Sequence, residues 1–215
     1  MSHLNHTVEL LAYSHWDNAR LHHYAKHVGD NEERSMMPIA AFIYEYFMYN
    51  SLYSINWNES LRTNDIKYYR NGKEKEQQEA FDKYIRSLCT GKEMLFIEEF
   101  KPILRLDFSG SWIQVIPDTR VSGKRGIDYF NNIKELQGLV SRARNGEGYV
   151  FDNIFDLIKR CREYVYLVRC NIFHGSKQIN DIDENHKKRI DVYFMFLKCF
   201  LYGFFKVSDN GRTLT

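Results

Sequence analysis

An apolar stripe along residues 151–172 is the feature that most limits how this chain can fold. Apolar side chains return there at intervals of three or four residues: Phe151, Ile154, Ile158, Cys161, Val165, Val168 and Ile172. This spacing places them on one face of an α-helix. Such a face must be buried against other elements, so we expect a long helix packed into a helical bundle.

Other segments also have helical patterns. Residues 39–57 are apolar on nearly every side, which is typical of a helix in the middle of a bundle; Ser35 can cap this helix, and Pro38 would lie in its first turn. Helical spacing predicts further helices at residues 8–28, 79–100, 127–145 and 187–206, with a possible break at Thr90-Gly91. The chain has only three prolines, and proline breaks helix interiors. The sequence therefore predicts an all-α fold.

Residues 102–126 have a different character. Pro102 and Pro117 lie in this segment together with three glycines, and residues 112–116 alternate loosely, as in a short strand. We interpret the segment as an irregular insertion within a single domain that spans residues 1–215. Residues 1–34 would form a helical extension at the N-terminus, and residues 127–206 would supply the last helices of the bundle.

Charge and cysteine usage favour a cytoplasmic protein without a membrane span. The formal net charge is +2, so any surface that binds nucleic acid must be a local patch. The four cysteines are far apart and form no CxxC pair, which indicates reduced, mostly buried thiols. The N-terminus lacks the apolar run of a secretory signal, and the apolar stretch at residues 190–205 is short and interrupted by charges.

Several common catalytic and metal-binding patterns are absent from the sequence. It contains no GxGxxG, GxSxG, HExxH or zinc-ribbon spacing, which argues against nucleotide hydrolases, α/β-hydrolases and metalloproteases. Six of the eight histidines fall in the first 27 residues, and His23 and His27 could share a helical face that binds a metal. Because no cysteine or HExxH-type partner accompanies them, we expect a solvated face and neither a metal nor an organic cofactor.

The most distinctive motif follows the apolar stripe directly. Residues 169–174 read RCNIFH, with Gly175 next as a possible helix cap. This R-x4-H pattern, placed between two predicted helices, resembles the signature of the HEPN superfamily, and in particular a bacterial branch that reads R-[NC]-N-[LI]-F-H-G. The resemblance covers residues 127–206. It departs from many members in having Cys170 directly after the arginine, where they carry a polar residue; Asn171 would then take that role.

The resemblance implies a HEPN-type helical bundle and a metal-independent endoribonuclease, either a toxin or a phage-defence effector. Two copies of the motif would face one cleft of a homodimer, and a cognate antitoxin or defence partner would bind the protein. Arg169 would stabilise the charge on the scissile phosphate, His174 would act as acid and base, and Asn171 would orient one of them. On an ideal helix, positions five apart lie about 140° apart, so a symmetric second copy would help to bring both side chains to one phosphate.

Basic side chains near the motif are candidates to follow an RNA backbone. They are Arg162, Lys177 and Lys188. Glu45 and Asn50 in the apolar helix are candidates to contact the arginine or the histidine of the motif. Charged runs are also common on solvated helix faces, and satisfied polar groups are common in cores.

Two other interpretations stay open. An arginine and a histidine near the C-terminus of a helix are both stabilised by the helix dipole, with no catalysis required. The chain would then be a non-catalytic module that binds nucleotide or RNA, or a dimerising scaffold. Alternatively, it is an antitoxin-like partner whose aromatic helix at residues 193–205 docks on another protein.

Overall fold

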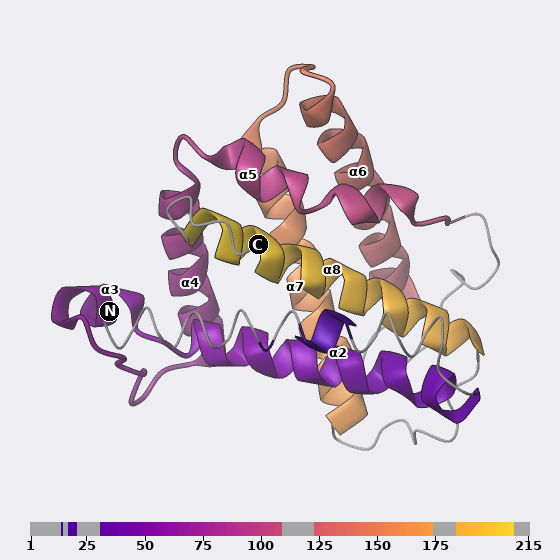
Figure 1. Ribbon diagram of the computed structural model, residues 1–215, viewed down its shortest axis with the longest axis horizontal. Helices are drawn as coiled ribbons and strands as arrows, with labels where there is room; N and C mark the ends of the chain where they lie inside the picture. Colours follow the sequence, from indigo (N-terminus) through magenta and orange to yellow (C-terminus); the bar gives the residue numbers. More distant parts are fainter. Residues whose placement is uncertain (1–13, 15–16, 21–30, 109–122, 174–183, 209–215) are drawn as a thin grey trace.

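The computed structural model describes residues 14, 17–20, 31–108, 123–173 and 184–208, and every element that it defines there is helical (Figure 1). The elements are α2 (Asn31–Tyr53), α3 (Trp57–Thr63), α4 (Glu74–Cys89), α5 (Glu93–Glu98), the 3-10 helix η1 (Lys101–Arg105), α6 (Gly123–Arg144), α7 (Phe151–Phe173) and α8 (Glu184–Ser208). Within these ranges the sole β-type pairing is an isolated bridge between Ile55 and Tyr68. The prediction of an all-α bundle is confirmed.

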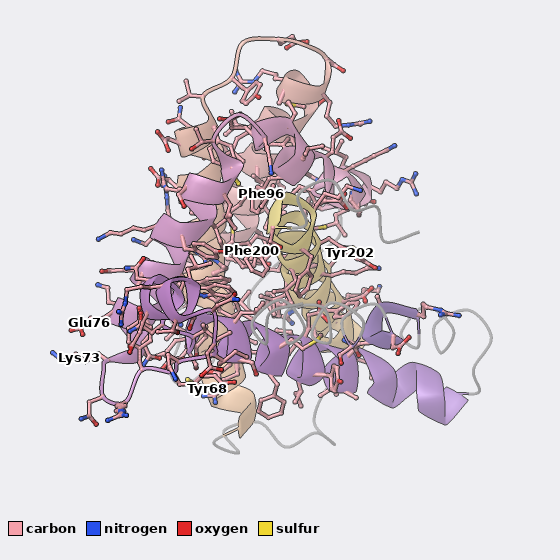
Figure 2. All side chains as sticks on the ribbon, turned by 60° about the vertical axis from the view of Figure 1, so that its left-hand side comes forward. Tyr68, Lys73, Glu76, Phe96, Phe200 and Tyr202 are labelled. Carbon is pink, nitrogen blue, oxygen red and sulfur yellow. The ribbon has the colours of Figure 1, made fainter. Side chains whose placement is uncertain are left out.

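The long helices pack in two pairs. α2 and α8 lie side by side along one layer, and α6 packs against α7 in the other (Figure 1). Phe96 of α5 and Phe200 of α8 meet in the interior, with ring centroids 6.2 Å apart (Figure 2). By contrast, Lys73 and Glu76 at the start of α4 point outward into solvent (Figure 2). The apolar interior is therefore continuous from α2 through α8 to α5.

The helix that carries the motif was predicted closely. α7 spans Phe151–Phe173, and the apolar residues expected on its buried face include Ile154, Ile158 and Val165, each fully buried. The expected break at Thr90-Gly91 is also present, because α4 ends at Cys89 and Gly91 has a φ of +73° that favours glycine. Local sequence signals decide these boundaries.

The boundaries of α2 differ from those expected. α2 begins at Asn31, so residues 31–34 belong to it and not to a separate extension, and Pro38 lies beyond its first turn. It ends at Tyr53, whereas the sequence suggested residue 57. A separate helix, α3, begins at Trp57, because the side chain of Asn56 accepts a hydrogen bond from the Glu59 backbone N–H and caps it.

The expected insertion is narrower than residues 102–126. Residues 101–105 form η1, and residues 123–126 begin α6. Buried Ile103 anchors η1, and the side-chain amide of Gln137 on α6 donates to the carbonyl groups of Ile103 and Leu106, at 2.6 and 3.0 Å. The strand expected at residues 112–116 lies outside the described residues.

Little of the expected N-terminal helix falls within the described ranges. Residues 17–20 are helical, and the side-chain amide of Asn18 donates to the Ala41 carbonyl at 3.2 Å and to Glu45 Oε2 at 2.8 Å. Because both acceptors are on α2, this short segment packs directly on that helix.

Among the helices described, none is both long and apolar enough to cross a membrane. Cys89, Cys161 and Cys199 are buried free thiols, and Cys170 is a partly exposed free thiol. Burial raises the pKa of the Cys89 thiol to about 12, so this side chain stays protonated and behaves as an apolar core residue.

Candidate functional site at the end of α7

Arg169 lies one turn before the C-terminal end of α7 and rests on α2. The centre of its guanidinium group is 5.3 Å from the ring centroid of Tyr46, and its Nη1 is 3.9 Å from the sulfur of Cys170. The side chain is partly buried. Partial burial opposes the charge, but Cys170, Tyr46 and Glu74 outweigh it and hold the pKa of Arg169 above its usual value. A permanent cation is thus held near the C-terminal end of the helix.

Polar groups from two other helices lie beside this arginine. The hydroxyl of Tyr53, in the last turn of α2, is within hydrogen-bond distance of both the Asn50 side-chain oxygen and the Glu74 carboxylate. Glu74 is the first residue of α4, where a carboxylate is stabilised by the positive end of the helix dipole. The ends of α2, α4 and α7 therefore meet in a polar cluster that consists of Tyr46, Asn50, Tyr53, Glu74, Arg169 and Cys170.

Arg162, two turns earlier on α7, has a different environment. It is 4% exposed, forms an ion pair with Asp82 of α4, and donates to the Tyr49 hydroxyl at 3.2 Å. Its guanidinium group also lies over the Phe200 ring, 4.5 Å from the centroid. Burial opposes the charge, yet Tyr49 and Asp82 hold the pKa of Arg162 above its usual value. An arginine that was expected to face RNA is instead a buried link between four helices, so we assign it no contact with RNA.

The other residues predicted for the site are only partly described. His174 and Lys177 lie outside the described residues, and so does the side chain of Asn171, although its backbone continues α7. Lys188 is exposed near the start of α8. Of the three predicted catalytic side chains, the structure therefore describes only that of Arg169.

The two polar residues of α2 that were expected to reach the motif form hydrogen bonds with other residues. Glu45 is buried and accepts from Asn18, and Asn50 accepts from Tyr53. The sequence analysis assigned no contact with the arginines of α7 to the tyrosines of α2. Tyr46, Tyr49 and Tyr53 recur at intervals of three and four, and their rings contact one another edge to face.

A groove lies over the outward face of α7, between α4 and α6. Its volume is about 520 Å³, and its wall includes residues 74–82 of α4, 128–132 of α6 and 159–167 of α7. Glu74 and Tyr166 belong to its lining, so the groove reaches the polar cluster around Arg169. No group of His, Cys, Asp and Glu side chains in the described part of the chain is arranged to hold a metal ion. Sequence patterns gave no sign of the groove because its three walls are far apart in the chain.

Comparisons with known proteins found no match: neither a family model, nor a curated protein, nor a solved structure is similar enough to this chain to be identified.

Proposed function

We propose that this chain is a metal-independent endoribonuclease of HEPN type that acts as a homodimer. The observation that carries the proposal is the position of Arg169. It lies near the C-terminal end of the penultimate long helix, five residues before the histidine of the motif, and the Tyr46 ring restrains its partly exposed guanidinium group. A restrained cation of this kind suits the binding of a phosphate that gains negative charge during a reaction.

In the proposed reaction, the 2′-oxygen of a ribose attacks the adjacent phosphorus atom, and the bond from phosphorus to the 5′-oxygen breaks. His174 takes the proton from the 2′-hydroxyl, and a proton is returned to the departing 5′-oxygen by the same residue or by His174 of the second copy. Arg169 stabilises the oxygens of the phosphorane-like transition state, and Asn171 orients one of these two side chains. The products are a 2′,3′-cyclic phosphate and a 5′-hydroxyl group.

The test is cleavage of a mixed pool of single-stranded and structured RNA in excess EDTA. Wild type should leave 2′,3′-cyclic phosphate ends. His174→Ala and Arg169→Ala should each lose at least about 100-fold in rate, as expected when an acid–base or charge-stabilising group is removed. Arg142→Ala is the matched control, because Arg142 is an exposed arginine in the last turn of α6 and lies outside the site. Circular dichroism and urea unfolding check that all variants are folded.

The proposal fails if the wild type is inactive in this assay, or if folded His174→Ala cuts as fast as wild type. A second candidate function would then stand: a non-catalytic module that binds nucleotide or RNA. Cys170 favours that candidate, because its thiol lies 3.9 Å from the Arg169 guanidinium, at the position where many HEPN nucleases carry a polar residue. RNA binding without cleavage, with affinity lost in Arg169→Ala, would support it.

A further inference from the structure

The groove over α7 has a charge pattern that does not suit a phosphate backbone. Asp82 and Arg162 neutralise each other. The remaining carboxylates of its wall are Glu74, Glu79, Asp128 and Glu163, and the remaining cations are Lys75, Lys159 and Arg160. Four carboxylates against three cations give no net attraction for a chain of phosphates, which binds where cations dominate. The part of a ligand that enters this groove is therefore uncharged or carries hydrogen-bond donors.

The chemistry of the wall favours a planar, polar ligand. Tyr166 of α7 is half-buried, and Tyr129 of α6 stacks on Tyr164, with centroids 4.8 Å apart. Burial, with help from Cys170 and Glu74, raises the pKa of Tyr166 to about 12, so its phenol stays neutral at ordinary pH. Aromatic side chains stack on unpaired nucleobases, and carboxylates accept hydrogen bonds from exocyclic amino groups.

The groove also lies in the right place relative to Arg169. Tyr166 precedes Arg169 by three residues on the same helix, so the two side chains are neighbours on the surface of α7. Glu74 links the groove to the cluster, because it lines the groove and is bonded to Tyr53 of α2. A nucleotide whose phosphate lies at Arg169 has its own or the adjacent base within reach of this groove, and a volume of about 520 Å³ is ample for one base.

We propose that the groove is a base-recognition subsite that selects single-stranded RNA with an amino-bearing base, namely adenine, cytosine or guanine, next to the phosphate bound at Arg169. This inference rests on the proposed function for the choice of RNA as ligand. Glu163 and Glu79 are the acceptors for the amino group, and Tyr166 is the stacking surface. Uracil, which has no exocyclic amino group, leaves the carboxylates without donors and binds more weakly.

The experiment measures the binding of fluorescently labelled hexamers of adenosine, cytidine and uridine to the His174→Ala protein, so that no cleavage is needed. The adenosine and cytidine hexamers should bind about 10-fold more tightly than the uridine hexamer, which is within the discrimination that hydrogen bonds to a base edge supply. Glu79→Ala and Glu163→Ala, which remove the acceptor oxygens, should reduce this ratio to about 2-fold or less when combined with His174→Ala. Glu135→Ala, at an exposed residue of α6 outside the groove, should leave the ratio unchanged.

Three outcomes separate this inference from the proposed nuclease. A ratio that the two groove substitutions do not change overturns the subsite, even if the wild type cleaves RNA. An equal gain in affinity for all three hexamers in those variants also overturns it, because the carboxylates would then only repel phosphates. A groove-dependent ratio in a protein that never cleaves RNA upholds the subsite and removes the nuclease.

Discussion

Two arginines on α7, seven residues apart, show how position in one helix separates a structural charge from a candidate functional one. Arg162 is 4% exposed, and Asp82 neutralises it, whereas Arg169, nearer the end of the helix, is partly exposed. Each lies over a tyrosine of α2: Arg162 over Tyr49, at 5.7 Å, and Arg169 over Tyr46, at 5.3 Å. A contact between an arginine of α7 and a tyrosine of α2 thus occurs twice, once inside the bundle and once at its edge.

The difference lies in how each charge is compensated. A buried cation needs a counter-ion and hydrogen bonds, because an uncompensated charge in the interior is costly, and Asp82 and Tyr49 supply both. A cation at the end of a helix keeps part of its hydration and is favoured by the helix dipole. The first arrangement fixes α7 against α2, α4 and α8, and the second leaves a partly exposed guanidinium group near the end of α7.

The largest expected effect is the difference in stability between two variants in which one or the other arginine is replaced by methionine. Arg162→Met should cost about 3–5 kcal/mol in the free energy of unfolding, because it leaves the Asp82 carboxylate buried without its partner. Arg169→Met should cost less than about 1 kcal/mol, the usual range of a partly exposed cation–π contact. Urea unfolding of both variants at pH 7 measures the difference. Similar losses for the two variants would mean that Arg169 is as structural as Arg162.

The double variant Asp82→Ala with Arg162→Met sharpens this prediction. It removes both charges, so it should lose less stability than the sum of the two single substitutions. Additive losses would show that the ion pair does not couple α4 to α7.

How well the sequence predicted each part of the molecule depends on the range of the interactions that decide it. α7 follows from its own apolar spacing, and the break after Cys89 follows from Gly91, so both could be predicted. The role of Arg162 depends on Asp82, eighty residues earlier in the chain, and no local pattern reveals that pairing. Its placement in a run of basic residues instead suggested a solvated face.

The same reasoning applies to the candidate site. The motif drew attention to Arg169 because the signal is contiguous in the sequence. Tyr46, which supports that arginine, is one of several polar side chains within an apolar helix, and its position beneath Arg169 emerges only when α2 packs against α7. The groove needs α4, α6 and α7 together, so its residues had no shared signal along the chain.

An intermediate effect is expected at the two tyrosines beneath the arginines. Tyr49→Phe removes the acceptor of the hydrogen bond from Arg162 and should cost about 1.5–3 kcal/mol, the range for hydrogen bonds to charged groups. Tyr46→Phe keeps the ring under Arg169 and removes a hydroxyl whose hydrogen-bond neighbour is the uncharged phenol of Tyr53. It should cost less, about 0.5–1.5 kcal/mol, the range for hydrogen bonds between neutral groups. Urea unfolding of the two variants side by side tests this order, and the reverse order would contradict it.

The smallest expected effect is a change with pH in the stability that Tyr49 contributes. Burial raises the pKa of Tyr49 to about 12, from an ordinary value of 10.0. Between these values the unfolded chain loses the phenol proton while the folded chain keeps it, so wild type loses stability as the pH rises, and Tyr49→Phe lacks this contribution. The stability difference between the two proteins should therefore shrink by about 1 kcal/mol from pH 8 to pH 11, since one pKa unit corresponds to about 1.4 kcal/mol. Urea unfolding at both pH values measures it. A constant difference would mean that the Tyr49 phenol ionises as readily in the folded protein as in the unfolded chain, and that the interior beside Arg162 is as accessible to water as the end of α7.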